Sequence, residues 1–408
     1  MQKNILYISY DGMTDPLGQS QVLPYICGLS QKGYRYTLLS CEKPERYATH
    51  RATIEKICLE NHIDWQPIMY TKKPPVLSTI WDVITLQKKA YNLHKKMKFS
   101  LTHCRGYISS LIGLSLRRRH GVPFLFDMRG FWADERIDGE IWNIKNPFYK
   151  FVYKFFKKQE LSFFNDSDVT ISLTQKGKEE IKSWENIKKN IDIEVIPCCA
   201  DMELFDFKKI NEERKQFFKQ KYNIQQNDYI LIYIGNFSTV YKFNEVLKVY
   251  KSIRKENLKF IICSHEPIDT FNLFLSKNDL IDDNQIYYDS LNRIDIPSVL
   301  SIADYSIFFC KEGFSRKATS PTRLAEILGC GLKVIINNGI GDTKELIESN
   351  ALGFVFNGFD DSEFSRFKEF FKYEKNYNKE HIHEISSSNF DVKNGIEKYL
   401  KVYTKIAK

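Results

Sequence analysis

Short apolar segments rich in β-branched and aromatic residues recur along the whole 408-residue chain, and helical stretches separate them. Continuous apolar runs are typical of parallel strands that are buried on both faces, whereas half-exposed strands alternate apolar and polar residues. The alternation with helices therefore predicts two doubly wound α/β units. The segments that we expect to form strands are 4–10, 36–41, 123–128 and 169–174 in the first unit, and 229–235, 259–264, 305–310 and 332–337 in the second.

A charged helical stretch at 211–222 separates the two sets of strands, so we place the domain boundary at about residue 206. This division gives an N-terminal unit at 1–205 and a C-terminal unit at 206–390. In open parallel sheets a ligand lies beyond the carboxyl ends of the strands, and two tandem units leave a cleft between them. The residues that directly follow the strands are therefore the candidates for function.

Composition narrows the class of protein. With 43% hydrophobic residues the chain is not intrinsically disordered, and its net charge of +9 suits an anionic partner of any kind. The nine cysteines are scattered without a C-x-x-C pair, so we expect reduced, mostly buried thiols in a cytoplasmic protein. No run approaches the roughly 18 apolar residues of a membrane span, and the absence of known nucleic-acid-binding motifs speaks against a nucleic acid partner.

The segment 316–331, RKATSPTRLAEILGCG, carries the strongest signature of a binding site. Ser320 is a good N-cap and Pro321 suits the first helical position, so the free amides of the next turn would face an anion. Thr322 and Glu326 are four residues apart and share a helix face. A carboxylate on that face could accept hydrogen bonds from vicinal hydroxyls, as a ribose would offer.

Two basic residues, Arg316 and Lys317, precede this helix and add positive charge beside the same spot. A well-capped helix with a solvated basic loop would produce the same pattern. The segment alone leaves both interpretations open.

The stretch SPTRLAEILGCGLKVIINNGIGDTKELIE (320–348) resembles the donor-binding helix of the family 4 retaining glycosyltransferases, together with the strand and loop that follow it. The resemblance covers nearly the whole chain and implies the GT-B fold, in which two Rossmann-like domains face each other across a cleft. It also implies that the acceptor lies on the N-terminal domain, that the C-terminal domain holds a nucleotide sugar, and that the last helix, about 391–408, packs back on the N-terminal domain. The other segments that resemble the family, in its order, are SYDGMTDPLGQSQVLPYICGLSQKGY (9–34), FDMRGFWADERIDG (126–139), ISLTQKGKEEI (171–181), VIPCCADMELF (195–205) and YIGNFSTVYKF (233–243).

The resemblance implies donor-binding roles for individual residues. Glu326 matches the second glutamate of the family's E-x7-E motif, which holds the ribose hydroxyls, and the amides of 320–322 would take the diphosphate. The residues that would line the donor phosphate and sugar from the two strand ends are Gly18, Gln19, Gly235 and Ser238. The loops at 264–265 and 290–291 would hold the base.

Two departures from the family pattern concern the donor. Ala318 stands eight residues before Glu326, where the first glutamate of the motif is expected, and Glu312 is out of register. Only Lys242 lies where the family often has an arginine and a lysine that neutralise the diphosphate. The two basic residues before the donor helix could share that role.

A third departure lies after the 123–128 strand, where the family often has a histidine. This chain reads Asp127-Met128-Arg129, and Arg129 could bind phosphate or sugar oxygens but could not act as a base. We take Asp127, Arg129 and Lys242 as the candidate catalytic residues.

The segment 145–160, KNPFYKFVYKFFKKQE, predicts a helix with two unlike stripes. One stripe would carry Lys150, Lys154, Lys157 and Lys158, and the opposite one Phe148, Phe151, Val152 and Phe155. Such a helix could contact anionic lipid or a polyprenyl-phosphate acceptor. Alternatively, its aromatic side chains pack inside the N-terminal unit while the lysines are solvated.

The sequence thus predicts a retaining hexosyl- or N-acetylhexosaminyltransferase that uses a UDP- or GDP-sugar and a glycan or lipid-linked acceptor in cell-surface polysaccharide synthesis. The resemblance implies no cofactor and no metal requirement, and we interpret the acidic pairs at 282–283 and 360–361 as solvated turns. We expect the protein in the cytoplasm or on the inner face of the membrane. Two alternatives stay open: a nucleotide-sugar epimerase of the same fold, and a non-catalytic protein that binds glycan or membrane.

Overall fold

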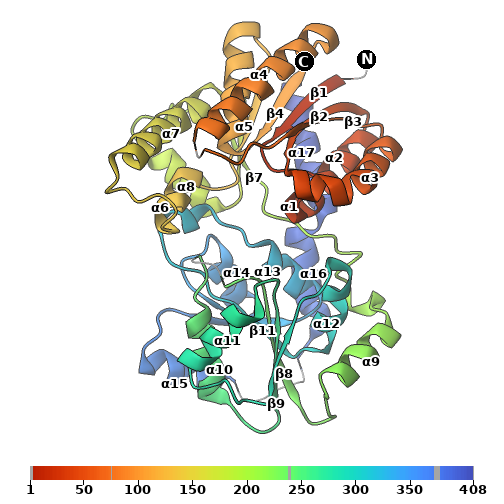
Figure 1. Cartoon of the computed structure of the whole chain (residues 1–408), viewed down its shortest axis with the longest axis vertical. Helices are drawn as coiled ribbons and strands as arrows, with labels where there is room; N and C mark the ends of the chain where they lie inside the picture. Colours follow the sequence, from red (N-terminus) through yellow and green to blue (C-terminus); the bar gives the residue numbers. More distant parts are fainter. Residues whose placement is uncertain (1–2, 75, 238–239, 372–376, 408) are drawn as a thin grey trace.

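The computed structural model describes residues 3–74, 76–237, 240–371 and 377–407, which form two α/β units stacked one above the other in Figure 1. Each unit is built on one all-parallel sheet. The strand order is β3-β2-β1-β4-β5-β6-β7 in the N-terminal sheet and β10-β9-β8-β11-β12-β13 in the C-terminal sheet. These two doubly wound sheets confirm the predicted fold class.

The strands of the N-terminal sheet are β1 (Lys3–Ser9), β2 (Tyr34–Glu42), β3 (Asp64–Met69), β4 (Leu101–Arg105), β5 (Phe124–Asp127), β6 (Val169–Ser172) and β7 (Ile193–Val195). Those of the C-terminal sheet are β8 (Tyr229–Ile234), β9 (Leu258–Cys263), β10 (Ile286–Asp289), β11 (Tyr305–Ile307), β12 (Lys333–Asn337) and β13 (Gly353–Phe356).

The helices that precede the C-terminal sheet are α1 (Pro16–Gln21), α2 (Leu23–Gln31), α3 (Pro44–Glu60), α4 (Leu77–Met97), α5 (Gly106–His120), α6 (Trp132–Asp138), α7 (Pro147–Asp166), α8 (Gln175–Ser183), η1 (Phe207–Lys209) and α9 (Glu212–Lys221). Those that follow are α10 (Phe243–Ile253), α11 (Ile268–Lys277), η2 (Arg293–Asp295), α12 (Ile296–Ile302), η3 (Phe314–Ala318), α13 (Thr322–Gly329), α14 (Thr343–Ser349), α15 (Asp361–Phe370), α16 (Lys379–Phe390) and α17 (Val392–Ile406).

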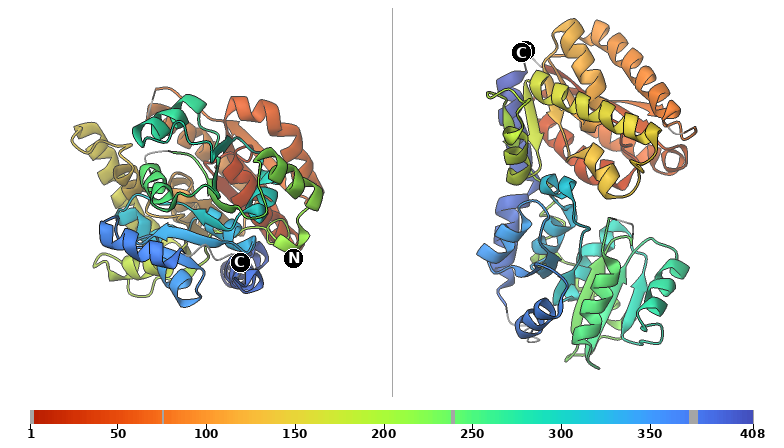
Figure 2. Two further views of the ribbon diagram at one scale, coloured as in Figure 1. Left: turned by 90° about the horizontal axis from the view of Figure 1, so that it is seen from below. Right: turned by 90° about the vertical axis from the view of Figure 1, so that its left-hand side faces the viewer.

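Helices cover both faces of each sheet (Figures 1 and 2), which explains the continuous apolar strands of the sequence. Every residue of β9, for example, is buried. The cysteines follow the same pattern, because all nine are free thiols and all except the half-buried Cys27 lie in the interior.

The chain crosses between the units twice. The expected boundary near residue 206 falls between β7 and α9, where Met202 and Phe205 already pack in the core of the C-terminal unit. After α16 the chain returns, and α17 packs against α2 of the N-terminal unit. Both ends of the chain therefore lie in the upper unit of Figure 1.

A short segment of the C-terminal unit, η3, docks on the N-terminal unit. The ring of Phe314 lies 5.0 Å from that of Phe131, and Ala318 is fully buried in the N-terminal core. Nearby, the carboxylate of Asp342 accepts hydrogen bonds from the first two backbone amides of α8. These contacts fix the position of one unit against the other at the level of the cleft.

Candidate functional site

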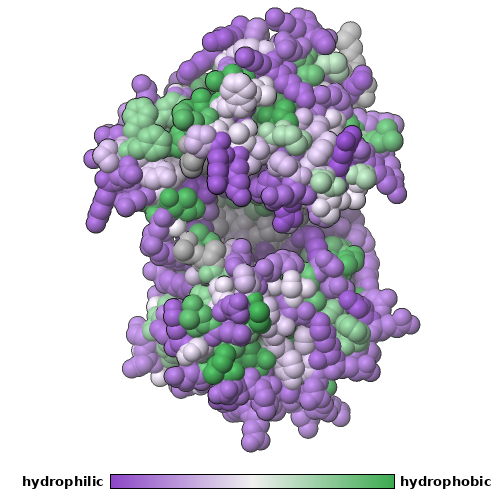
Figure 3. Space-filling view, viewed as in Figure 1, coloured by the Kyte–Doolittle hydropathy of each residue, from purple (hydrophilic) through white to green (hydrophobic). Residues whose placement is uncertain are grey.

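The carboxyl ends of the two sheets face each other across the hollow between the units that Figure 3 shows. The segment after β7 joins the two sides. Cys198 accepts a hydrogen bond at Sγ from the Arg129 guanidinium, 3.0 Å away, and its backbone N–H donates to Ser320 Oγ at 3.2 Å. The end of β5 and the start of α13 are therefore neighbours, as the sequence predicts for residues that follow strands.

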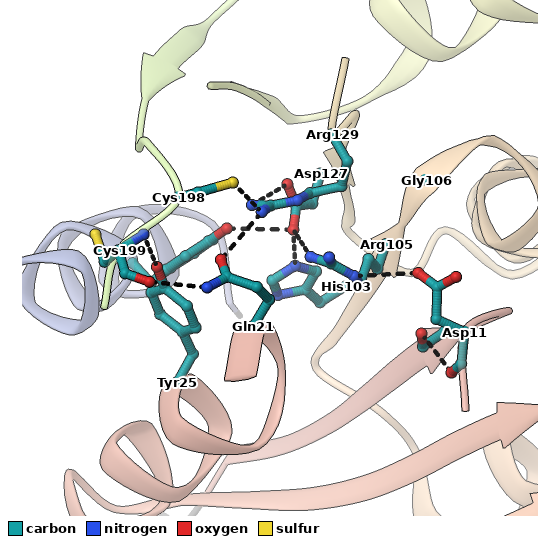
Figure 4. Close-up of polar contacts among 12 residues, drawn as sticks. Asp11, Gln21, Tyr25, His103, Arg105, Gly106, Asp127, Arg129, Cys198 and Cys199 are labelled. Atoms are coloured by element: carbon teal, nitrogen blue, oxygen red, sulfur yellow. Dashed lines mark hydrogen bonds and ion pairs between the residues drawn. The ribbon is translucent and has the colours of Figure 1, made fainter. Parts of the chain in front are cut away.

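Asp127, at the end of β5, lies at the centre of a buried polar cluster on the N-terminal side (Figure 4). Its Oδ2 is 3.5 Å from His103 Nε2 and 3.9 Å from Arg105 Nη1, and it accepts a hydrogen bond from Tyr399 of α17 at 3.2 Å. Burial alone would raise the pKa of Asp127, but Arg129, His103 and Arg105 lower it to about 2. Asp127 is 1% exposed, so its carboxylate contacts other side chains and is not accessible from the cleft.

Arg129 connects this cluster to the cleft. Its guanidinium lies 3.7 Å from Asp127 Oδ1 and donates to Gln21 Oε1 at 3.5 Å as well as to Cys198. The backbone of Arg129 has a φ of +56°, a left-handed conformation that costs a non-glycine residue on the order of 1 kcal/mol. A side chain held in this way is preorganised, which suits a residue that meets a ligand.

The predicted donor loop after β1 is folded tightly. A Cβ on Gly18 would come 2.2 Å from the carbonyl oxygen of Gly12, so only glycine allows α1 to pack on this turn. Gln19 is exposed, and its side chain donates to the carbonyl of Thr14 at 3.2 Å. The buried carboxylate of Glu42 accepts hydrogen bonds from the backbone amides of residues 13 and 14 and so holds the loop in place.

The start of α13 differs from the sequence prediction. Pro321 is the N-cap and Thr322 the first helical residue, so the prediction that Ser320 caps the helix with Pro321 inside it is wrong. The Ser320 hydroxyl accepts the backbone N–H of Cys198 across the cleft and is not available as a cap. Within the described residues no hydrogen bond reaches the amides of Thr322 and Arg323, which are thus free to meet an anion.

Glu326 follows one turn later on α13 and forms an ion pair that the sequence did not suggest. Its Oε1 lies 2.7 Å from Nη1 of Arg293, at the start of η2. Burial raises the pKa of Glu326, and Arg293 opposes this rise. Arg293 comes four residues after the end of β10, so its place beyond a strand end was the only available signal.

Two of the predicted donor-side cations are paired with glutamates. Lys242 Nζ lies 2.6 Å from Glu312, and Lys317 Nζ lies 2.7 Å from Glu180 of the N-terminal unit. Arg316, on η3, is buried, and its Nε has no hydrogen-bond partner among the residues that the structure describes. The predicted cations therefore differ in how much of their charge remains for a ligand.

Sequence reasoning missed Arg323. Its guanidinium lies 4.3 Å from the ring centroid of Tyr241 and directly against Gly235, where a Cβ would come 2.5 Å from Nη2. Glycine at 235, with a φ of +137°, is thus required by the close approach of this arginine to the end of β8. Ser238, the other predicted residue of this loop, lies outside the described residues.

The loops expected to hold a base lie side by side at the ends of β9 and β10. His265 Nδ1 and Ser290 Oγ are 2.6 Å apart, and Tyr288 donates to the carbonyl of Ser264 at 3.3 Å. His265 is exposed, whereas Leu291 is buried. The two loops could therefore offer backbone groups and the imidazole edge to a base.

The predicted stripes of α7 are wrong. Phe148, Phe151 and Phe155 are 50%, 69% and 41% exposed, so they do not pack in the N-terminal core. The buried face contains Val152 and Phe156 instead. Lys157 points inward and pairs with Asp134 at 2.8 Å, while the lysines at 150, 154 and 158 are exposed on the same outer surface as the three phenylalanines.

The acidic pairs show no metal-binding arrangement. Asp360 is the N-cap of α15, whereas Asp283 is buried and accepts a hydrogen bond from Tyr250 at 2.9 Å, which corrects its interpretation as a solvated turn. Within the described part of the chain, no group of three or more metal-ligating side chains comes together. Nor does any described helix combine the length and the apolar character needed to cross a bilayer.

Two family descriptions match the chain. The family "Glycosyltransferase Family 4" matches residues 21–204, and the family "Glycosyl transferases group 1" matches residues 214–384. The two matches fall on the N-terminal and C-terminal units respectively. No curated protein sequence matches the chain.

Solved structures share the fold along its whole length. A glycosyltransferase from Rickettsia africae is 17% identical, with a TM-score of 0.70, over 100% of this chain and 99% of the other. The Anabaena protein HepE in complex with UDP and glucose is 12% identical, with a TM-score of 0.68 and coverages of 99% and 100%. The lipopolysaccharide outer core galactosyltransferase WaaB is 13% identical, with a TM-score of 0.65 and coverages of 98% and 99%.

Proposed function

We propose that this chain, which belongs to the family 4 glycosyltransferases and has their GT-B fold, moves a sugar from a nucleoside diphosphate sugar to an acceptor hydroxyl. The sugar would be a hexose or an N-acetylhexosamine, and the donor a UDP- or GDP-sugar. The acceptor would be a glycan or a lipid-linked glycan of the cell surface. The similarity to an Anabaena structure that holds UDP and to a galactosyltransferase of lipopolysaccharide supports this choice.

The observation that carries the proposal is the arrangement around α13. The free amides at its start face the cleft, Glu326 lies one turn further on the same helix, and the turn at Gly235 closes the site from the end of β8. A helix start binds phosphate through its amides and its dipole. The Glu326 carboxylate would accept hydrogen bonds from the two ribose hydroxyls, and its pairing with Arg293 opposes the rise in its pKa that burial causes.

The transfer breaks the bond between the anomeric carbon and the phosphate oxygen. The electron pair of this bond stays on the diphosphate, and the acceptor oxygen forms the new bond to the same face of the sugar. The departing phosphate oxygen takes the acceptor's proton, so the configuration is retained without a protein nucleophile. Groups that stabilise the developing negative charge, such as the α13 amides and nearby cations, therefore accelerate the reaction without a requirement for a metal ion.

The N-terminal residues would orient the reacting groups. Arg129, at the cleft, would contact phosphate or sugar oxygens, and the buried Asp127 would hold Arg129 in position without touching substrate. Lys242 is paired with Glu312, which neutralises its charge. It would therefore contact the donor sugar as part of this ion pair and not as a free cation. Ala318 is buried in the N-terminal core, so it cannot substitute for the glutamate expected there.

The Glu326→Ala variant tests the donor site. We expect the purified wild-type protein to bind UDP or GDP, seen by calorimetry and by a rise in melting temperature, and the variant to lose that binding. The fold should survive, because Arg293 is 41% exposed and can be hydrated when its partner is removed. Glu348→Ala, which removes a surface carboxylate on α14, is the matched control and should bind like the wild type.

Undiminished donor affinity in the Glu326→Ala variant would contradict the assignment. Incubation of the wild type with donor sugars in the absence of acceptor tests the epimerase alternative, because an epimerase would convert its donor while a transferase would not. Comparison with and without Mg²⁺ tests whether the protein needs a metal.

The outer surface of α7 supports a second part of the proposal, a peripheral contact with the inner face of an anionic membrane. Three exposed phenylalanines lie beside the exposed lysines 150, 154 and 158. Aromatic rings insert at the interface of a bilayer, and each lysine near an anionic surface adds about 1 kcal/mol. Such a contact would bring the cleft near a lipid-linked acceptor.

Co-sedimentation with lipid vesicles tests this contact. We expect binding to vesicles that contain anionic lipid and little binding to zwitterionic ones. The triple variant Lys150→Glu, Lys154→Glu, Lys158→Glu should lose the binding, whereas Lys398→Glu, on the outside of α17, should keep it. Equal binding by both variants would exclude α7 as the membrane-facing surface.

A further inference from the structure

Three helices of the N-terminal unit form a layer with a positive outer surface. The helix α5 packs against both α4 and α7, so the three cover the same face of the sheet (Figures 1 and 2). Together they contain eleven lysine and arginine residues but only three carboxylates. Asp82 and Glu160 are buried, and Asp166 is paired with Arg118. The layer therefore presents no unpaired carboxylate among the described residues, whereas α3 of the same unit has three acidic and three basic residues.

Large apolar side chains form an exposed stripe along the first half of α4. The members of this stripe are Leu77, Ile80, Trp81 and Ile84, which are 64%, 50%, 64% and 40% exposed. Their spacing of three and four residues places them on one face of the helix. Exposed lysines at positions 88 and 95 continue the same face. A group of large apolar side chains that faces water together is typical of a surface that another surface covers.

The apolar stripe of α4 and the exposed phenylalanines of α7 both lie at the cleft end of this layer. The carboxylate of Asp82 accepts hydrogen bonds from the Tyr10 hydroxyl and the backbone N–H of Thr71, at 2.9 and 3.2 Å. These two partners directly follow β1 and β3, so they fix the start of α4 at the carboxyl edge of the sheet. Similarly, Tyr153 of α7 donates to Asp134 of α6, the helix that follows β5, at 2.7 Å.

The mixture of side chains favours a lipid bilayer over a protein as the partner of this surface. Lysine is depleted in protein–protein interfaces. Here each exposed phenylalanine of α7 has an exposed lysine one or two positions away in the sequence, and exposed lysines at 72 and 73 precede α4. At the surface of an anionic bilayer, apolar side chains enter the boundary between headgroups and acyl chains while lysines extend to the headgroups. Tryptophan, as at position 81, is enriched at that boundary.

We propose that the outer surface of α4, α5 and α7 is a membrane-docking face, and that its apolar end at the rim of the cleft enters an anionic bilayer. The stripe of α4 adds a second line of attachment to the contact through α7. Two helices fix the orientation of the unit on the bilayer, which one helix alone does not. The N-terminal side of the cleft would then open at the level of the lipid headgroups, where a lipid-linked acceptor presents its sugar. This last consequence rests on the proposed function, whereas the docking itself is independent of sugar transfer.

Quenching of tryptophan fluorescence by brominated lipid tests whether α4 enters the bilayer. The full-length protein is mixed with vesicles of phosphatidylglycerol and phosphatidylcholine that carry bromine on their acyl chains. We expect quenching of the wild type and much less quenching of the Trp81→Phe variant, because Trp81 is exposed while the other four tryptophans are half-buried. Equal quenching of the two proteins would place Trp81 outside the bilayer and contradict the proposal.

Co-sedimentation with unbrominated vesicles of the same lipids measures the contribution of the stripe. The combined variant Ile80→Ser, Trp81→Ser, Ile84→Ser should bind these vesicles about tenfold more weakly than the wild type or worse, because attachment scales with the apolar area that enters the bilayer. Its melting temperature and its affinity for UDP or GDP should be those of the wild type, since the three side chains are exposed and lie outside the donor site. If this variant fails to fold, the conservative Trp81→Phe variant decides the question.

The matched control removes equally exposed apolar side chains from the C-terminal unit. It combines Phe217→Ser, Leu273→Ser and Ile294→Ser, at residues that are 46%, 54% and 70% exposed. This variant should bind the vesicles like the wild type. An equal loss of binding in the control would show that exposed apolar residues act without regard to position, and the docking face would be wrong.

The remaining outcomes separate this proposal from its alternatives and from the proposed function. Wild-type vesicle affinity in the folded α4 variant, with a loss in the α7 lysine variant, would confine the contact to α7. Self-association of the wild type without lipid, seen by light scattering and lost in the α4 variant, would make the stripe an interface between copies of the chain. Vesicle binding without binding of UDP or GDP would keep the docking face and contradict the transferase, and nucleotide binding without vesicle binding would do the reverse.

Discussion

The two sides of the cleft differ in how closely their buried charges are paired. On the N-terminal side, one carboxylate, Asp127, lies within 4 Å of His103, Arg105 and Arg129 and accepts a hydrogen bond from Tyr399 (Figure 4). On the C-terminal side, Arg316 is buried and Arg323 is stacked on Tyr241, and no carboxylate of the described residues lies within 4 Å of either guanidinium. The charges of the first arrangement thus lie within 4 Å of an opposite charge, whereas the two arginines have no described carboxylate at that distance.

This difference predicts which charges stabilise the fold and, under the proposed function, which charges bind a ligand. The Asp127 cluster joins β4 and β5 to α17, the helix that returns from the C-terminal unit, and it is largely closed to solvent. Removing one member would leave buried charges unpaired. The arginines near α13 have no carboxylate partner among the described residues, so removing them breaks no ion pair. Their removal should therefore weaken nucleotide binding more than it lowers the stability of the fold.

The largest effect that we expect is on the N-terminal side. Asp127→Ala should lower the free energy of unfolding by about 3 to 5 kcal/mol, because it leaves Arg105 and Arg129 buried without their shared counter-charge. Thermal or urea unfolding followed by circular dichroism measures this change. Asp11→Ala is the control, since Asp11 lies 3.5 Å from the same Arg105 but is half exposed, and it should change stability by less than about 1 kcal/mol.

A loss below about 1 kcal/mol for Asp127→Ala would remove the contrast between the two sides, because pairing would then contribute little to the N-terminal cluster. A strong loss of activity with unchanged stability would make Asp127 a residue that acts in the reaction itself.

The sequence predicted those strands whose buried side chains are apolar. All eight predicted strands are present with shifts at their ends, because continuous apolar runs between helices leave few other folds open. The strand β4, LTHCR, was not predicted, since its His103 and Arg105 are buried through hydrogen bonds and ion pairs with distant residues. The strand β3 was missed because it is only half buried and contains Pro67, as an edge strand can.

The candidate site was predictable in its location and less so in its contacts. The segment after β7 and the start of the SPTRLAE helix do lie together, because the carboxyl ends of parallel strands share one edge. Which cations are neutralised depends on partners far away in the chain, such as Glu180 for Lys317 and Glu312 for Lys242. No local pattern reveals such pairs, and for the same reason Arg323 was overlooked.

The stability of the N-terminal unit should depend on pH through one buried carboxyl group. Glu160 of α7 is fully buried, and burial raises its pKa from the ordinary 4.5 to about 7, although Lys157 and Tyr107 oppose the rise. A carboxyl group whose pKa is higher in the folded state contributes stability that is fully present below pH 4.5 and is lost as the pH rises through 7.

The Glu160→Gln variant removes this titration. Between pH 4.5 and 8, we expect the wild type to lose about 1 to 3 kcal/mol of stability relative to the variant. Unfolding free energies measured across this range test the prediction. Parallel curves for the two proteins would show that the Lys157 pair keeps Glu160 ionised throughout, and the N-terminal side would then be as fully paired as the Asp127 cluster suggests.

The smallest expected effect lies at Ser320, where the two sides of the cleft join. Its hydroxyl accepts the backbone N–H of Cys198, so Ser320→Ala should lower the free energy of unfolding by about 1 kcal/mol. Hydrogen exchange locates the loss: the Cys198 amide should exchange faster, while the amides that begin α13 keep their wild-type rates, because Pro321 and not Ser320 is the N-cap. Faster exchange throughout the first turn of α13 would instead show that the serine stabilises the donor helix. The same residue would then couple the stability of the fold to the anion site, and the separation between the paired and the unpaired side of the cleft would no longer hold at their junction.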